Sequence, residues 1–235
     1  MLRVFIGYDH RQPISYNVLQ FSIMRRASVP VAITPIVLPT LPFKRQGLTP
    51  FTFSRFLVPW LCDYQGWAIF MDIDMLALGD IAELAAEAND KYAAMVVKND
   101  LHFEWPSMIL FNCGHPANRQ LTPEYCETSP GLHKLSWLVD RELIGDLPRE
   151  WNHLVGYCSP RTDAKLVHFT QGMPIYEETS GSEYSAEWRA EAEAAGSAAP
   201  WMELMGRSIH AAPSKDNTRL VARLHADAQR EVAHA

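Results

Sequence analysis

The chain has 235 residues, of which 48% are hydrophobic and 20% are charged. This length and composition predict a globular protein with one sizeable core. The net charge of −6 comes from 21 basic and 27 acidic residues without long blocks of either sign, which argues against a nucleic-acid ligand. The four cysteines form no CxxC pair or Cys/His series, so we expect neither a zinc site nor a dense disulfide framework.

The first ten residues, MLRVFIGYDH, contain too few apolar residues for a signal peptide or a membrane span. We therefore expect a cytoplasmic protein, either free or peripheral to the inner face of the membrane, with no transmembrane segment.

The first part of the chain alternates strand and helix patterns. Residues 3–8 (RVFIGY) predict a buried strand, and residues 12–27 predict a helix because apolar side chains recur at helical spacing. These side chains are Ile14, Val18 and Phe21. Residues 31–37 (VAITPIV) predict a second strand, and the proline, glycine and basic residues of 39–50 predict a loop.

Residues 52–64 (TFSRFLVPWLCDY) predict a helix with one apolar stripe. The stripe consists of Phe53, Phe56, Leu57, Trp60 and Leu61. Pro59 is expected to kink this helix, and Arg55 falls on the side opposite the stripe.

Three short apolar segments of strand type follow, at residues 67–71, 93–97 and 107–112. Between the first two, GDIAELAAEA (79–88) predicts a helix capped by Asp80. This alternation favours an α/β fold, a mostly parallel central sheet flanked by helices.

The later part of the chain divides into a last strand and a helical tail. Residues 164–170 (AKLVHFT) predict the strand, and the alanine-rich residues 185–196 and 218–235 predict amphipathic helices packed over or beside the core. We expect a main domain at residues 1–180 and a helical extension at 181–235.

Two acids interrupt the apolar run AIFMDIDMLAL (68–78). Alternate side chains of an extended segment point the same way, so Asp72 and Asp74 would converge about 6.6 Å apart while Ile73 turns inward. Their mutual repulsion calls for a cation, and ligands gather at the carboxyl ends of strands in open α/β sheets. The acids therefore predict a metal site, with the alternative that they end the strand or cap the turn before Gly79.

A histidine at the end of another predicted strand can complete this site. In LVHFTQG, His168 closes the strand and Gly172 follows. A lone histidine is more often structural, but one facing a carboxylate pair becomes a metal-ligand candidate. Two carboxylates and an imidazole suit Mn²⁺ somewhat better than Mg²⁺ and leave coordination positions for the oxygens of a pyrophosphate.

Several stretches, in order from about Val4 to Pro174, resemble family 8 of the retaining glycosyltransferases, which includes glycogenin and bacterial lipopolysaccharide galactosyltransferases. They are FIGYD, TFSRFLVPWL, AIFMDIDML, LFNCG, WLVDRELIGDLPREWN and LVHFTQG. The resemblance implies a Rossmann-like GT-A fold, a donor that is most often a UDP-sugar, and Mn²⁺ held by Asp72, Asp74 and His168. It also implies transfer to an acceptor hydroxyl with retention, a donor phosphate oxygen taking the proton.

The same resemblance implies roles for residues around the donor. Asp9 would read the uracil, with Tyr8 and Tyr16 as stacking surfaces. Arg55 would contact the donor phosphate or sugar, and Ile73 lies in the donor-binding stretch.

Three residues, Asn112, Asp140 and Arg141, correspond to positions near the reacting carbon in the family. Asn112 would touch the donor sugar and Asp140 would bind sugar hydroxyls, whereas Arg141 stands where the family usually has Gln. The alternatives are an Asn that ends a strand and an Asp on a helix surface.

The backbone N–H groups around Gly172 would cradle an oxyanion. Gly172 comes one place late, however, and the usual Lys of the pyrophosphate site is missing. Either Arg55, Lys44 or Arg45 supplies that charge, or donor binding differs from the family pattern.

Two other functions compete with the transferase. A non-catalytic nucleotide-sugar binding relative agrees with both departures, and a haloacid dehalogenase-like phosphatase also carries a D-x-D motif on an apolar strand. The sequence leaves open the donor sugar, whether the acceptor is a glycan or a lipid-linked sugar, and whether the protein forms a homodimer.

Overall fold

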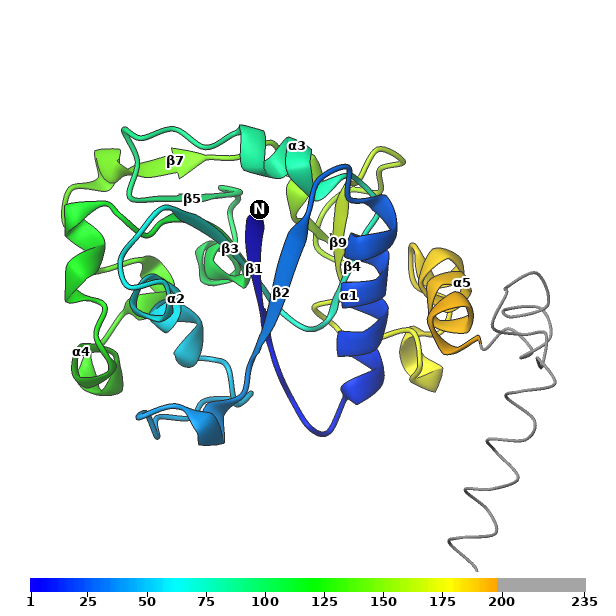
Figure 1. Ribbon diagram of the computed structural model, residues 1–235. Coiled ribbons are helices and arrows are strands. Elements are labelled where there is room, and N and C mark those ends of the chain that lie inside the picture. Colours follow the sequence, from blue (N-terminus) through cyan, green and yellow to red (C-terminus); the bar gives the residue numbers. More distant parts are fainter. Residues whose placement is uncertain (198–235) are drawn as a thin grey trace, which may run out of the picture. The chain divides into compact units, whose positions relative to one another are not determined.

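The computed structural model describes residues 1–197, which contain two sheets (Figure 1). A six-stranded sheet has the order β2-β1-β3-β6-β5-β7, and a three-stranded sheet has the order β4-β9-β8. The strands are β1 (Leu2–Gly7), β2 (Val31–Ile36), β3 (Trp67–Met71), β4 (Met75–Ala77), β5 (Ala94–Val96), β6 (Met108–Asn112), β7 (Ile144–Asp146), β8 (His153–Leu154) and β9 (Leu166–His168).

Strand directions in the larger sheet decide which loops meet. β1 runs parallel to β2 and β3, and β5 runs parallel to β7, but β6 is antiparallel to both of its neighbours, β3 and β5. The carboxyl ends of five strands and the beginning of β6 therefore lie along one edge, which we call the carboxyl edge. The predicted mostly parallel sheet is confirmed, with β6 as the reversed strand.

The helices are α1 (Pro13–Arg26), α2 (Val58–Leu61), α3 (Ile81–Ala86), α4 (Pro123–Thr128) and α5 (Ser185–Gly196). α3 begins as predicted, because the Asp80 carboxylate accepts a hydrogen bond from the backbone N–H of Ala82 at 2.9 Å.

The buried face of α1 differs from the predicted stripe. Val18 is buried, but Ile14 is 38% exposed and Phe21 is only half-buried. The packed face instead includes Ser22, whose hydroxyl accepts a hydrogen bond from the backbone of Ala77 in β4 at 3.1 Å. A small polar side chain lets the helix approach the strand closely, and apolar periodicity alone does not detect such a contact.

Residues 52–64 do not form the single helix that we predicted. A 3₁₀ helix, η2 (Ser54–Leu57), leads directly into α2, and Pro59 lies in the first turn of α2, where its missing N–H is tolerated. Because a 3₁₀ helix turns every three residues, a period of 3.6 does not describe η2. Most of the predicted stripe still faces the core, since Phe56 and Leu57 are buried and Phe53 and Leu61 pack against the core. Arg55, which we placed opposite the stripe, is only 6% exposed.

Sequence patterns missed the short strands β4, β7 and β8. β4 is the most important of them, because it begins directly after the acid pair and pairs antiparallel with β9, setting Met75 opposite His168. The smaller sheet thus joins two segments about 90 residues apart in the chain, and this pairing builds the site described below.

The predicted helix at residues 185–196 is confirmed as α5. Its Trp188 is buried in a cluster with Val18, Leu76 and Phe169. Its Glu191 is also buried and forms ion pairs with Arg25 and Arg26 at the end of α1.

Contacts group residues 1–195 into one compact unit. The division at residue 180 stays a prediction. The helix predicted at 218–235 lies outside the described residues.

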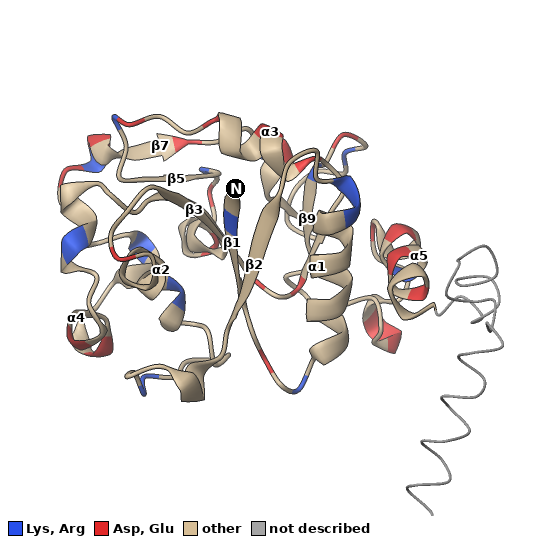
Figure 2. Cartoon of the chain, viewed as in Figure 1, with Lys and Arg blue, Asp and Glu red and all other residues tan. Residues whose placement is uncertain are grey.

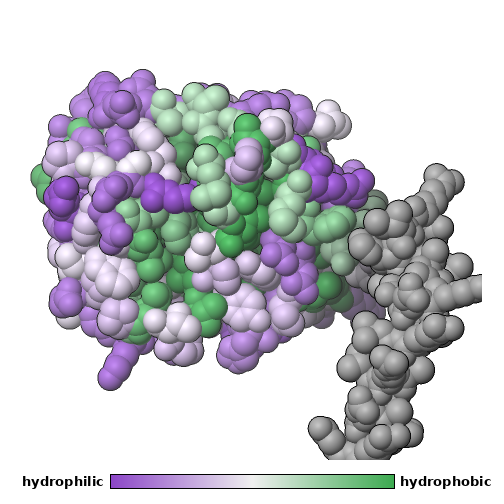
Figure 3. All heavy atoms as spheres, viewed as in Figure 1, coloured by the Kyte–Doolittle hydropathy of each residue, from purple (hydrophilic) through white to green (hydrophobic). Residues whose placement is uncertain are grey.

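The described surface is mixed in character. Basic and acidic residues alternate along the chain without large blocks of one sign (Figure 2). The space-filling view shows apolar residues gathered in a band across the middle of one face (Figure 3). No helix within residues 1–197 is long and apolar enough to cross a membrane.

Candidate metal and donor site

The acid pair lies where the chain passes from the large sheet to the small one. The backbone N–H of Asp72 donates to the carbonyl of Ser107 at 2.9 Å, and the carbonyl of Asp74 accepts from the N–H of Phe169 at 2.9 Å. Ile73, between the acids, is buried in the core, so only its main chain could contact a donor. Hydrogen bonds on both sides therefore fix the two carboxylates at the carboxyl edge.

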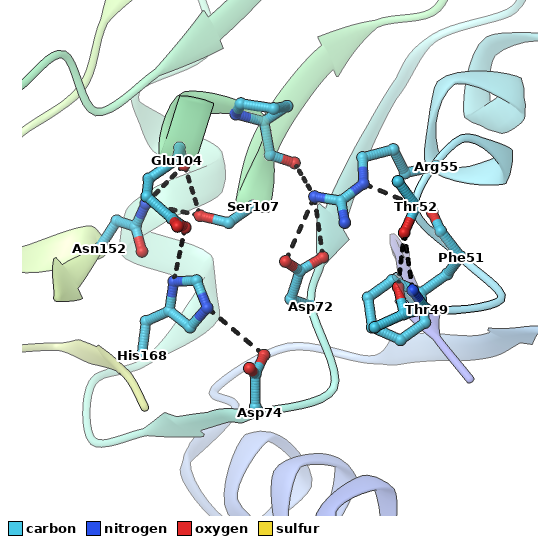
Figure 4. A network of polar contacts seen from close by, with 11 residues as sticks. Thr49, Phe51, Thr52, Arg55, Asp72, Asp74, Glu104, Ser107, Asn152 and His168 are labelled. Atoms are coloured by element: carbon cyan, nitrogen blue, oxygen red, sulfur yellow. Dashed lines mark hydrogen bonds and ion pairs between the residues drawn. The ribbon is translucent and has the colours of Figure 1, made fainter. Parts of the chain in front are cut away.

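The structure brings together the three predicted metal ligands. Asp72, Asp74 and His168 each offer one ligand atom, and these atoms all lie within 4.8 Å of one another. His168 faces the acids because β9 pairs with β4, and its Nε2 lies 3.4 Å from Oδ1 of Asp74 (Figure 4).

The chemistry of this cluster fits a divalent cation. Oδ1 of Asp72 and Oδ1 of Asp74 are buried and accept no hydrogen bond within the described part of the chain. Each has a nitrogen nearby, because Nη1 of Arg55 lies 3.0 Å from Oδ1 of Asp72 and Nε2 of His168 lies 3.4 Å from Oδ1 of Asp74. Buried carboxylate oxygens that lack hydrogen bonds are costly, and a hard cation stabilises them. The residues present therefore suit Mn²⁺ or Mg²⁺, the ions expected from the sequence.

Proton affinities point the same way. Burial raises the pKa of Asp72 to about 7, against the effect of Arg55, and burial also raises the pKa of the nearby Glu104 carboxyl. Burial disfavours charge on the His168 imidazole, but the surrounding carboxylates, Asp74 first, still raise its pKa. The cluster thus holds more negative charge than Arg55 compensates, and protons or a cation must supply the rest.

Arg55 points into this site from η2. Its Nη1 lies 3.0 Å from Oδ1 of Asp72 and donates to the carbonyl of Pro106 at 2.9 Å. The guanidinium also lies over the ring of Phe70, 5.1 Å from its centroid. Arg55 is therefore a buried, oriented cation beside the first acid.

Glu104 is a site residue that the sequence analysis missed. It lies in the 3₁₀ helix η3 (His102–Ser107), just before β6, and its Oε2 is 3.8 Å from Nδ1 of His168 (Figure 4). The sequence predicts ligand residues at the carboxyl ends of strands, whereas the reversal of β6 brings the residues before that strand to the same edge. An acidic residue shortly before a strand indicates a site residue only when that strand is known to run antiparallel to its neighbours.

Asn152 and Ser107 support the segment that carries Glu104. Asn152 is buried, and its amide donates to the hydroxyl of Ser107 at 2.9 Å. The hydroxyl of Ser107 in turn donates to the carbonyl of Glu104 at 2.6 Å. These bonds hold η3 against the segment that leads into β8.

Asp9, the residue expected to read the uracil, has an intrachain partner. It is fully buried, and Nε of Arg11 donates a hydrogen bond to Oδ1 of its carboxylate at 2.9 Å. This hydrogen bond holds the pKa of Asp9 below its usual range. In this structure Arg11 pairs with the Asp9 carboxylate, and direct reading of a base by Asp9 stays a prediction.

A pocket of about 660 Å³ lies beside Asp9, and Tyr8 lines it. Tyr16 packs edge-on against Tyr8, with ring centroids 5.6 Å apart. Lys44 and Arg11 also line the pocket, whereas Arg45 turns away and donates to the carbonyls of two residues in and after α4. Of the cations considered for a diphosphate, Arg55 and Lys44 thus remain.

Asn112 lies at the wrong end of β6 for the predicted sugar contact. Antiparallel pairing sets Asn112 opposite Trp67 at the start of β3, while Met108 lies opposite Met71 next to the acids. Asn112 is therefore four residues along the strand from Met108 at the carboxyl edge, about 13 Å at the usual rise. The sequence of this stretch matches the family motif, but β6 runs antiparallel to β3, so its last residue, Asn112, lies at the edge of the sheet opposite the acids.

Asp140 and Arg141 lie at the start of another 3₁₀ helix, η6 (Arg141–Leu143). The Asp140 carboxylate caps it by accepting from the N–H of Glu142 at 3.0 Å, so the helix-surface alternative describes its present contact. Arg141 lines a pocket of about 280 Å³ together with Trp105.

Gly172 has φ of 121°, which favours glycine, but its N–H donates to the carbonyl of Phe169 at 2.9 Å. The Gly172 N–H is therefore engaged within the chain, and an oxyanion contact by the N–H groups around Gly172 stays a prediction.

Comparison with known proteins gives a relative and a fold. The chain is 41% identical over 225 residues to Protein CDI of Arabidopsis thaliana, an alignment that covers 81% of this chain and 86% of that protein. No protein-family model matches.

The solved structures of three glycosyltransferases are similar to this one. The bifunctional WbbM has a TM-score of 0.60 at 15% identity and covers 88% of this chain, which spans 51% of the WbbM chain. The galactosyltransferase LgtC has a TM-score of 0.58 at 9% identity, with 86% of this chain and 99% of that chain covered. GlyE of Streptococcus pneumoniae TIGR4 has a TM-score of 0.59 at 12% identity, with 81% and 60% covered. These similarities establish the GT-A fold that the sequence predicted.

Proposed function

The chain belongs to the family of Protein CDI of Arabidopsis thaliana and has a GT-A fold, and from these premises we propose that it is a glycosyltransferase. In our proposal it is a retaining, family 8-type enzyme that moves a hexosyl group from a UDP-sugar to an acceptor hydroxyl. The observation that carries the proposal is the convergence of Asp72, Asp74 and His168 within 4.8 Å at the carboxyl edge.

Four side chains would organise the metal. Asp72, Asp74 and His168 would hold it, and the ion, when bound, would neutralise the charge that develops on the leaving diphosphate. Glu104 would accept the Nδ1 proton of His168 and leave Nε2, the nitrogen on the Asp74 side, free as a ligand.

The donor would extend from this cluster toward the 660 Å³ pocket. Tyr8 offers a ring to the base, and Lys44 offers a charge in place of the missing Lys after Gly172. Arg55 neutralises Asp72 when no cation is present and is placed to contact a donor phosphate when one is.

In this proposal the acceptor hydroxyl attacks from the face that the diphosphate leaves, and a donor phosphate oxygen takes its proton. No protein base is required for that step. The chain's own contribution is to position the donor and to aim fixed charges at the leaving group.

The proposal is tested by measuring UDP release and thermal stabilisation in parallel. UDP-glucose, UDP-galactose, UDP-N-acetylglucosamine and GDP-mannose are each added with and without Mn²⁺. We expect Mn²⁺-dependent stabilisation by UDP-sugars, by mass action on the folded state, and UDP release from one of them. Absence of any nucleotide-dependent shift with Mn²⁺ present would refute the proposal.

A non-catalytic nucleotide-sugar binding protein is the second candidate. Arg141 in place of Gln and the missing Lys after Gly172 favour it. It would show the stabilisation without UDP release from any donor. The phosphatase alternative is removed by the GT-A fold.

A further inference from the structure

A small pocket next to the metal-ligand cluster combines an aromatic ring with positive charge. Its volume is about 280 Å³, and it lies where η3, η5 (Leu132–Lys134) and η6 come together. The lining side chains are His102, Trp105, Lys134, Ser136 and Arg141. None of these described lining residues is acidic, and two of them, Lys134 and Arg141, are cationic.

Two of the lining groups are held in fixed orientations. The indole N–H of Trp105 donates to the carbonyl of Asn99 at 3.0 Å, which sets the plane of the ring. Nη1 of Arg141 donates to the carbonyls of Lys134 at 2.9 Å and Leu135 at 3.1 Å. These bonds use one of the three guanidinium nitrogens, so an oriented arginine and an oriented aromatic face are built in before any ligand arrives.

The pocket and the proposed catalytic site are connected through η3. This 3₁₀ helix carries His102 and Trp105, which line the pocket, and also Glu104, whose carboxylate is 3.8 Å from Nδ1 of His168. The carbonyl of Pro106, the next residue, accepts from Arg55 at 2.9 Å. η3 therefore contributes residues both to the pocket and to the surroundings of the metal-ligand cluster, and a sugar that extends along η3 would contact both.

We propose that the pocket binds an anionic sugar, one that carries a carboxylate or a phosphate. The apolar face of the sugar ring packs on Trp105, and the anionic group forms charge-assisted hydrogen bonds with Arg141 and Lys134. The inference rests on the proposed function in taking the ligand to be a sugar, and it explains why an arginine stands where the family usually has the neutral Gln.

The anionic group can belong to the donor or to the acceptor, and two calorimetric binding series separate them. The donor series compares UDP-glucuronate with UDP-glucose in the presence of Mn²⁺. The acceptor series compares free glucuronate and glucose 6-phosphate with glucose, with and without UDP. We expect a preference of about tenfold or more for the anionic compound in at least one series.

Matched variants assign the preference to the pocket. Arg141→Gln should abolish it, and so should Lys134→Gln, which removes an exposed side chain and keeps the test valid if Arg141→Gln does not fold. Arg119→Gln, an exposed arginine over the ring of Tyr64 and outside this pocket, should leave it unchanged.

Two results would overturn the inference. One is equal binding of charged and neutral sugars in both series, and the other is a preference that survives both pocket variants. The acceptor series without UDP measures sugar binding to the pocket even when no nucleotide binds to the protein. A failure of the proposed function is therefore distinguishable from a failure of this inference.

Discussion

Removing the guanidinium of Arg55 should destabilise the protein through the carboxylate that it leaves behind. Arg55 and Asp72 form a buried ion pair, with 3.0 Å between Nη1 and Oδ1. Truncating one partner of such a pair costs about 3 to 5 kcal/mol, because the other charge stays buried without compensation. At roughly 2 to 4 °C per kcal/mol for a chain of this size, Arg55→Met should lower Tm by roughly 6 to 20 °C.

The penalty should depend on pH in a defined direction. Burial raises the pKa of Asp72 to about 7 from an ordinary 3.8, so between these values the folded state binds more protons than the unfolded state. The contribution of Asp72 to the free energy of unfolding therefore falls as pH rises from 3.8 to about 7. Loss of Arg55 raises the pKa further, so Arg55→Met should be much less stable at pH about 8 than at pH about 6.

A double-mutant cycle isolates the pair from the other contacts of Arg55. The bond to the carbonyl of Pro106 is lost in Arg55→Met with or without Asp72→Asn, so it cancels. Urea unfolding in EDTA at pH about 8 should give a coupling energy of about 2 kcal/mol, with the double variant more stable than Arg55→Met. Equal stability of these two variants would refute the reasoning.

Three further predictions concern the same site and its surroundings. Asp74→Asn should abolish Mn²⁺-dependent stabilisation by UDP in a thermal melt, whereas the matched Asp90→Asn should retain it; an unchanged shift in Asp74→Asn would exclude this acid as a ligand. Glu104→Met should weaken Mn²⁺ affinity by about 10- to 100-fold in calorimetry, since it removes the acceptor for Nδ1 of His168, and an unaltered Kd would show that this carboxylate has no orienting role. Burial and two nearby arginines lower the pKa of His133 to about 4 from 6.5, so the unfolded state binds more protons in that window and this group contributes stability that is lost as pH falls. His133→Phe should lessen that loss between pH about 6.5 and 5 in urea unfolding, and an identical pH dependence in variant and wild type would contradict it.

Local patterns in the sequence determined most of the helices and strands and the three candidate metal ligands. Periodicity predicted five of the six strands of the large sheet, all but β7, and the helices α1, α3 and α5, because the spacing of apolar side chains and a capping Asp act within a few residues. The acids Asp72 and Asp74 were found because they end a buried strand, and His168 because it ends another.

Tertiary structure alone decided which strand ends meet and what neutralises each charge. The reversal of β6 takes Asn112 away from the site and brings Glu104 into it, and strand direction depends on pairing between distant segments. Arg11 covers Asp9 and Arg55 pairs with Asp72, which follows from the folding of loops and a 3₁₀ turn that no apolar period marks. A single sequence encodes the local spacing of residues, whereas the partners of a buried charge are set by contacts formed only when the chain closes.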